Sequence, residues 1–269
     1  MTTFNIARFA DSSSTIFSAG VANGQLPGVS VVHKFGRNAA VSTSFVPIAL
    51  GGVYQTPQPA NATTLRVKAG DVVDTAAGDG AREITIQGLD ATGALVSDVL
   101  ATAGTSASAV STNSYIRLFR AWVSASGTYA STSAGSHDSA IVIENGAGGT
   151  DWLTIGATGF PKGQSEVAVY SVPLGKTAYI TDIKLTVDSG KTVDVVAFKR
   201  ENILETAAPY TAMRAFRYWT GLKGDTTDNP EIPYGPFPAL TDIGFMGIVA
   251  VTASGIEVAF EIILIDEDE

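Results

Sequence analysis

The residues whose types could do chemistry are few, and the histidines come first. The chain has two of them, His33 and His137, and it has no cysteine. His137 is followed by Asp138 and Ser139, which are the residue types of a hydrolase triad. Successive strand residues point to opposite faces of a sheet, whereas a triad needs three groups that converge from different elements. The tripeptide therefore predicts no triad, and a surface position is the ordinary reading of such a histidine.

Metal ligands are equally scarce in this sequence. Two histidines, no cysteine and no Asp-x-Asp-x-Asp-Gly loop leave neither a zinc pattern nor an EF-hand pattern to assemble. The closing run Ile-Asp-Glu-Asp-Glu, residues 265–269, offers carboxylates for a loosely held cation. A solvated acidic tail that keeps an apolar edge strand from aggregating explains the same run better. We predict no metal site.

Glycine-rich segments and carboxylates complete the search for chemistry. Residues 146–159 hold closely spaced glycines, but a strand-like segment follows them where a phosphate cradle needs a helix N-terminus. The Asp-Gly pair within residues 77–83 is typical of a hairpin turn. Paired acids for glycoside hydrolysis must face each other across a groove, and the candidate glutamates are scattered along the chain. We therefore expect no enzyme activity and no cofactor. The scattered candidates are Glu83, Glu166, Glu201 and Glu205.

Composition limits the partners and the compartment. Of 269 residues, 26 are acidic and 17 basic, which gives a net charge of -9. Affinity for a nucleic-acid backbone depends largely on Lys and Arg, so nucleic acid and anionic membrane surfaces are expected not to be partners. The absence of cysteine excludes disulfides. The first residues form neither a basic segment nor an apolar segment of the signal-peptide type, so we expect synthesis in the cytoplasm.

Alternating apolar and polar residues, separated by turn formers, predict strands along most of the chain. The fold class that follows is all-β, with two antiparallel β-sandwich domains of jelly-roll type preceded by an extended N-terminal arm. The arm covers residues 1–60, the first sandwich 61–160 and the second 161–269. The proline-rich segment 223–242 is expected to be an exposed excursion, because its prolines prevent pairing as a central strand. The predicted strands are 63–69, 81–90, 94–103, 114–125, 137–146, 151–159, 165–173, 177–188, 191–201, 212–221, 243–253 and 255–267.

Several short motifs occur in a characteristic order along the chain. They are Lys-Phe-Gly-Arg-Asn at 34–38, Gly-Gly-x-Tyr at 51–54, Gly-Ala-Arg at 80–82, Gly-Leu-Asp at 88–90 and Val-Pro-x-Gly-Lys-Thr-Ala-Tyr-Ile at 172–180. Together with their surroundings, which cover most of the chain, they resemble a family of virion structural proteins of tailed bacteriophages, especially marine ones. The resemblance implies a component of the virus particle and brings no catalytic residues with it.

Two functions remain open after this reading. The first is a structural subunit of the particle, as a capsid-associated decoration, turret or head-fibre protein. The second is a tail-fibre or receptor-binding module that recognises the host surface. We expect a homo-oligomer, with a trimer preferred, that also contacts other virion proteins such as the major capsid protein. Aromatic and aliphatic residues of the arm and the proline-rich segment are the candidate partner contacts. These candidates are Phe4, Ile6, Phe35, Phe45, Tyr234 and Phe237.

Overall fold

A computed structural model describes residues 20–21, 23–52, 62–127, 137, 139–157, 163–205, 207–251 and 253–267. Sixteen strands lie in these ranges, and every strand pair is antiparallel. The prediction of an all-β chain is confirmed. None of the helical segments in the described ranges has the length and apolar character needed to cross a membrane.

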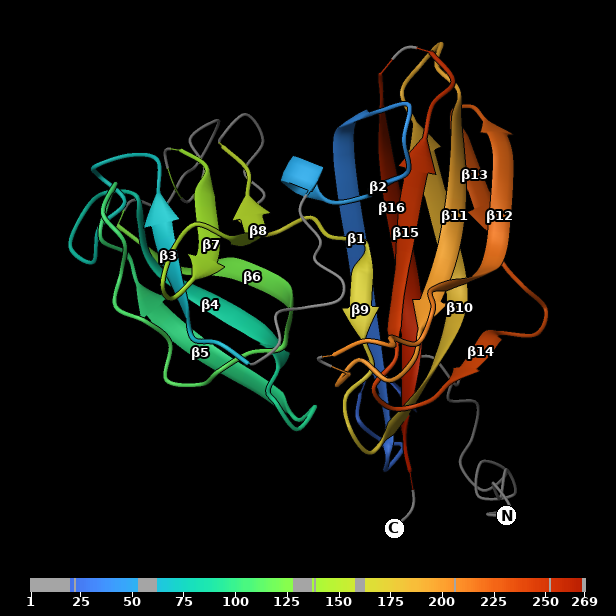
Figure 1. Cartoon of the computed structure of the whole chain (residues 1–269), viewed down its shortest axis with the longest axis horizontal. Coiled ribbons are helices and arrows are strands. Elements are labelled where there is room, and N and C mark those ends of the chain that lie inside the picture. Colours follow the sequence, from blue (N-terminus) through green and yellow to red (C-terminus); the bar gives the residue numbers. More distant parts are fainter. Residues whose placement is uncertain are drawn as a thin grey trace.

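Two five-stranded sheets form what we call the C-terminal lobe, on the right in Figure 1. The strands of its first sheet are β1 (Val29–Val41), β16 (Ser254–Asp266), β10 (Lys176–Val187), β13 (Asp225–Asp228) and β14 (Tyr234–Phe237). The strands of its second sheet are β12 (Arg214–Leu222), β11 (Val193–Arg200), β15 (Asp242–Ile248), β2 (Val46–Pro47) and β9 (Val169–Ser171). The first sheet has the order β1-β16-β10-β13, with β14 also on β10, and the second has the order β12-β11-β15-β2, with β9 also on β15.

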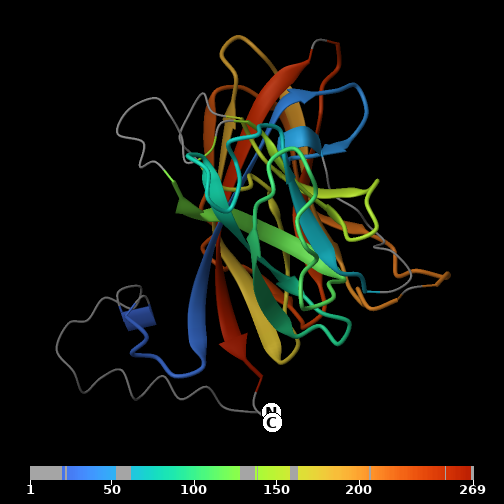
Figure 2. The ribbon, with the colours of Figure 1, turned by 90° about the vertical axis from the view of Figure 1, so that its left-hand side faces the viewer.

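Two three-stranded sheets form the N-terminal lobe, on the left in Figure 1 and in front in Figure 2. The strands of one sheet, in spatial order, are β3 (Leu65–Ala69), β7 (Ile141–Asn145) and β8 (Asp151–Ile155). The strands of the other, again in spatial order, are β5 (Leu95–Ala101), β4 (Ala81–Leu89) and β6 (Arg117–Ser126).

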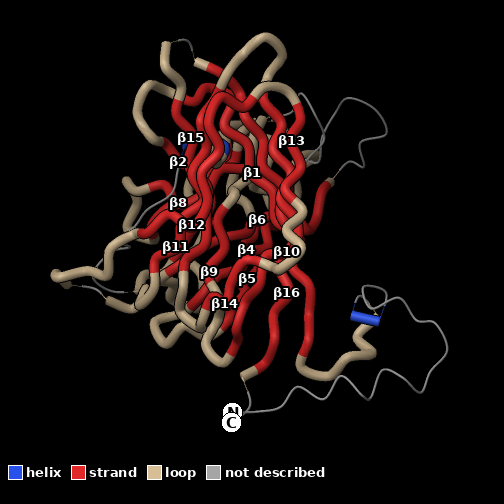
Figure 3. Tube along the Cα trace, turned by 90° about the vertical axis from the view of Figure 1, so that its right-hand side faces the viewer, coloured by secondary structure: helices blue, strands red, loops and turns tan. Residues whose placement is uncertain are grey.

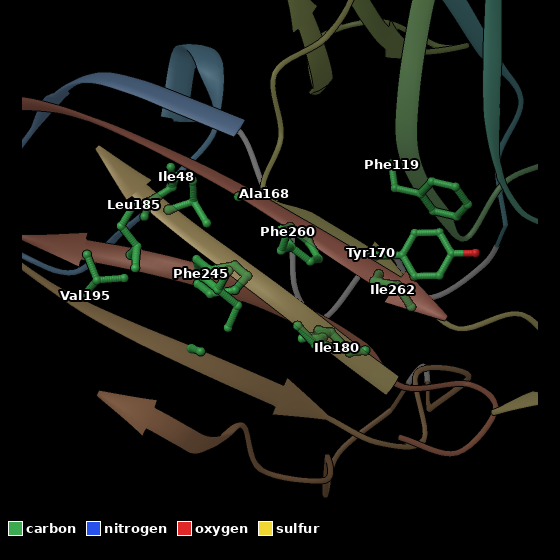
Figure 4. Packing of buried hydrophobic residues seen from close by; sticks show 14 of the residues in the cluster. Ile48, Phe119, Ala168, Tyr170, Ile180, Leu185, Val195, Phe245, Phe260 and Ile262 are labelled. Atoms are coloured by element: carbon green, nitrogen blue, oxygen red, sulfur yellow. The ribbon is translucent and has the colours of Figure 1, made fainter. Parts of the chain in front are cut away.

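The core follows from the period of two in the strands. Along β16, the residues Ile256, Val258, Phe260, Ile262 and Leu264 are buried, while the glutamates between them lie on the opposite face. Their partners on β10 are likewise buried, with Ile180 opposite Ile262. Residues of the second sheet, such as Val195 and Phe245, belong to the same cluster, so the two sheets pack face to face (Figure 4).

The buried clusters do not follow the predicted domain boundary. Leu89, Ile116 and Phe119 from the N-terminal lobe belong to the cluster of the C-terminal lobe. In the opposite direction, Val167 and Val169 belong to the cluster of the N-terminal lobe. Apolar side chains therefore continue from one lobe into the other. The described chain does not divide clearly into the two self-contained sandwiches that the sequence predicts.

The predicted arm is wrong for its described second half. Val29 to Val41 form β1, which pairs with β16 from Val29 opposite Ile265 to Val41 opposite Ser254. In Figure 3, β1 lies among the long strands of the C-terminal lobe. The alternation of apolar and polar residues does not predict this strand, because Lys34, Gly36 and Asn38 occupy buried positions where a core strand ordinarily has apolar residues.

The proline-rich segment also differs from the expected excursion. It contributes β13 and β14, which both pair with the side of β10 opposite β16. Pro236 lies inside β14, at the edge of the sheet, which is where proline is tolerated because it donates no ladder hydrogen bond. The prediction that the segment forms no central strand agrees with this position.

Candidate functional site

A buried ion pair joins the two lobes. Nε of Arg117, on β6, donates to both carboxylate oxygens of Asp242, on β15, at 3.1 and 3.0 Å. The Ser171 hydroxyl donates to the same carboxylate at 2.6 Å, and Arg117 Nη1 donates to the Ile116 carbonyl at 2.9 Å. The Arg117 side chain is 2% exposed and that of Asp242 is 0% exposed. Removing either partner would leave the other charge buried and unpaired, so this ion pair holds β6 of one lobe against β15 of the other.

A second contact between the lobes involves Lys34. Its side chain leaves β1, is 5% exposed overall, and donates from Nζ to the carbonyl of Phe119 on β6. The guanidinium of Arg120, one residue further along β6, donates to the carbonyl of His33. Burial, and then the positive charge of Arg120, hold the pKa of Lys34 well below its usual range. Two basic side chains thus meet along β1 at the lobe boundary.

A cleft of about 520 Å³ opens beside these two residues. Its walls come from both lobes and are mainly apolar, with basic side chains among them. No aspartate or glutamate is found among the described residues that line it. The lining residues are Ser30, Val31, Val32, His33, Lys34, Gln87, Ala94, Leu95, Phe119, Arg120, Tyr170, Pro173, Leu174, Lys176 and Leu264.

The outer face of the first sheet is a separate candidate surface. Its register places Val31 opposite Ile263 and Ile263 opposite Tyr179, so three large side chains form a row across three strands. Val29 and Ile265 form the adjacent pair, and Phe35 lies on the same face four residues beyond Val31. All six side chains are half-buried. We call these six residues the outer face.

The predicted partner contacts fall in different environments. Phe4 and Ile6 lie outside the described residues. Phe35 belongs to the outer face, and Phe45, in the turn between β1 and β2, is 46% exposed. Their role as contacts stays a prediction.

The two candidates from β14 differ from each other. Tyr234 is half-buried, and its hydroxyl lies 3.2 Å from both carboxylate oxygens of Asp228. Phe237 is 2% exposed and packs against Phe216 with 5.1 Å between ring centroids. The prediction for Phe237 is therefore wrong, because its alternation within β14 turns it into the core.

The residues first considered for chemistry are separated by the fold. His33 is exposed and its Nδ1 lies 3.2 Å from Glu261 Oε1 on the neighbouring strand. His137 is 3% exposed, with Nε2 2.5 Å from the Gly156 carbonyl oxygen, so the surface reading is wrong for it. Within the described ranges, no group of three or more His, Cys, Asp or Glu side chains is placed to hold a metal ion.

Sequence reasoning missed the residues that organise the lobe boundary. Arg117 and Asp242 are 125 positions apart, and Lys34 and Phe119 are 85 apart. The only signal in the sequence is a charged residue within an otherwise apolar strand, as at Arg117 in the segment Tyr-Ile-Arg-Leu-Phe. Such a residue indicates a buried pair without saying what its partner is.

Comparisons with known proteins find weak structural neighbours and no matching sequence. No family model matches the chain, and no curated protein matches it. Among solved structures, "Structure of infectious bursal disease virus Gx strain" aligns over 88% of this chain and 71% of that chain, with 14% identity and a TM-score of 0.24. "Structure of infectious bursal disease virus Gt strain" aligns over 95% and 82%, with 11% identity and a TM-score of 0.20. Both neighbours are structures of a virus, and similarity at this level supports no argument about fold or function.

Proposed function

We propose that the chain is a structural protein of a bacteriophage particle, a capsid-associated decoration, turret or head-fibre subunit. The observation that carries the proposal is the outer face. On a regular sheet it presents aliphatic and aromatic side chains on both sides of the exposed His33–Glu261 pair, where a subunit that works alone ordinarily presents polar residues throughout. The resemblance to tailed-phage virion proteins supplies the class of particle.

The proposed partners are further copies of the chain, in a trimer, and other virion proteins such as the major capsid protein. Nucleic acid and membranes are not among them, in keeping with the net charge of -9. The protein is made in the host cytoplasm and resides in the virion. It works through binding, without catalysis, metal or cofactor.

A tail-fibre or receptor-binding module is the second candidate. Aromatic side chains around Asp228 favour it: Trp219 Nε1 donates to Asp228 at 3.1 Å, and the Tyr234 hydroxyl lies 3.2 Å from the same carboxylate. Arg217 Nε also donates to Asp228, at 2.9 Å. Close by in sequence, Tyr218 is 49% exposed and Ile232 is 82% exposed. Exposed aromatic and aliphatic groups with an acid nearby are the means by which a surface loop can contact a host glycan or protein.

Assembly through the outer face is tested by light scattering on the purified chain. The unchanged chain is expected to form an oligomer, and Phe35→Glu or Ile263→Glu is expected to give a monomer of 27.8 kDa with unchanged circular dichroism. A charge at either position cannot be desolvated in an apolar contact without a large cost. Val251→Glu is the matched control, because Val251 lies in a loop, is 84% exposed and lies off this sheet.

Attachment to the particle is tested with the same variants. Purified particles should contain the chain, as detected by mass spectrometry, and should bind added chain on sedimentation. The structural proposal is contradicted if the unchanged chain is a monomer at micromolar concentration and is absent from purified particles. Binding to host cells in place of particles supports the second candidate.

A further inference from the structure

The cleft between the lobes holds positive charge that the protein itself does not neutralise. Of its basic residues, Lys176 is paired with Asp266 and His33 with Glu261. The hydrogen-bond acceptors of Lys34 and Arg120 are backbone carbonyls. In the part of the chain that the structure describes, neither side chain has a carboxylate partner. This is unusual for a lysine that is 5% exposed.

A third donor lies beside these two charges. Tyr170, on β9, is 2% exposed and lines the cleft, and its ring packs at a tilt against that of Phe119 with 4.8 Å between the centroids. Its hydroxyl points away from the packed side chains of the cluster (Figure 4). No hydrogen bond joins this hydroxyl to a described residue. Burial raises the pKa of Tyr170, so the group keeps its proton and can donate it in a hydrogen bond.

The remaining wall is apolar. Val31, Val32 and Leu264 line the C-terminal side of the cleft, and Leu95 and Leu174 stand at its mouth. Leu95 is 50% exposed and Leu174 is 55% exposed, so both have aliphatic surface that an occupant would remove from water. A volume of about 520 Å³ lies in the range of small-molecule sites.

We propose that the cleft binds a small organic carboxylate with an aliphatic body, its carboxylate held by Lys34, Arg120 and the Tyr170 hydroxyl. A carboxylate supplies the counter-charge that both basic groups lack, and it accepts several hydrogen bonds at once. The aliphatic body lies against the leucines and valines. Because β1 and β9 belong to one lobe and β6 to the other, the bound ligand ties the lobes together. This site shares Val31 with the outer face but is otherwise formed by different residues, and it goes beyond the proposed particle role.

The test is calorimetric titration of the full chain with octanoate. Octanamide has the same body without charge, and acetate has the charge without the body, so each is expected to bind at least about tenfold more weakly. In a methyl spectrum, the signals of Leu95 and Leu174 should shift with octanoate. Saturable octanoate binding that octanamide matches would overturn the charge assignment, and no binding at millimolar octanoate would overturn the site.

Variants locate the contacts. Arg120→Gln and Tyr170→Phe are each expected to weaken octanoate binding about tenfold, since each removes one hydrogen bond to a charged group. Both changes spare the core, because Arg120 is half-buried and Phe keeps the Tyr170 ring. Lys34→Met removes the buried charge at similar length and is expected to have the largest effect. Lys223→Met, an exposed lysine outside the cleft, is the matched control. Equal affinity in all four variants would contradict the proposal.

Discussion

Asp242→Asn probes the joint between the lobes most sharply. The substitution keeps the shape of the side chain and removes its charge, so the Arg117 guanidinium stays buried without a counter-ion. Arg117 is 2% exposed and retains the Ile116 carbonyl as its other acceptor. Breaking a buried ion pair by removing one partner costs about 3 to 5 kcal/mol. We expect a loss of that size in the free energy of unfolding.

The assay is urea unfolding followed by tryptophan fluorescence. Of the three tryptophans, Trp152 belongs to the cluster of the N-terminal lobe, Trp122 lies on β6 of the same lobe, and Trp219 belongs to the cluster of the C-terminal lobe. A Trp219→Phe background therefore reports the N-terminal lobe, and a background with both Trp122→Phe and Trp152→Phe reports the C-terminal lobe. In the unchanged chain the two transitions should coincide, because the clusters share side chains across the boundary. In Asp242→Asn the two unfolding transitions should either separate or shift together to a lower urea concentration.

Two further variants complete the test. Glu201→Gln removes the carboxylate that Arg214 and Lys199 share near the surface, at 2.6 and 2.7 Å, and should cost less than about 1 kcal/mol. Replacing both partners, as Arg117→Met with Asp242→Leu, should recover most of the loss, because no charge is then left buried. A loss for Asp242→Asn no larger than that of Glu201→Gln would refute the reasoning.

Three other outcomes follow from the same structure. The pKa of Lys34 in the folded chain lies below its value in the unfolded chain because of burial and of the charge of Arg120 on β6, and the other titratable groups that line the same cleft are His33, Tyr170 and Lys176. Between the two pKa values of Lys34 the unfolded chain binds the extra proton, so stability should rise with pH through that interval in urea titrations, and Lys34→Met should flatten the slope. Gly36→Val should abolish folding or lower the unfolding midpoint sharply in thermal circular dichroism, because a Cβ at this position would lie 2.0 Å from the backbone nitrogen of Ala168, whereas Ala39→Val on the exposed part of β1 should have little effect. A fragment of residues 163–267 lacks β1 and leaves the edge of β16 unpaired, so it should aggregate or stay unfolded by circular dichroism, and cooperative unfolding of that fragment would show that β1 is dispensable.

Most strands could be predicted because their alternation is regular. The segment 81–90 contains β4, and 255–267 contains nearly all of β16, with apolar residues at every second position over most of their lengths. β1 was missed for the opposite reason, since its buried positions carry Lys34, Gly36 and Asn38. Each of these is explained only by a tertiary neighbour: the Phe119 carbonyl, the Ala168 backbone and the Pro47 carbonyl.

The cleft could not be predicted, because it forms where three distant segments meet. Lys34, Arg120 and Tyr170 lie on β1, β6 and β9, and nothing local distinguishes any of them from an ordinary strand residue. The same holds for Phe237, whose segment reads as an exposed loop until its pairing with Ala178 on β10 turns the ring inward. Local patterns predict which segments are strands, whereas the neighbours across a sheet decide which faces are buried.

The position of the chain on an intact particle tests the proposed function most directly. Antibody raised against the purified chain, used as a gold label in electron micrographs of intact phage, should mark the head. Density for the chain on the capsid surface, with the outer face against a neighbouring copy or the shell, is the arrangement that the proposed function predicts. Label confined to the tail tip would favour receptor binding, and purified particles that carry no label and no trace of the chain would contradict the assignment to the virion.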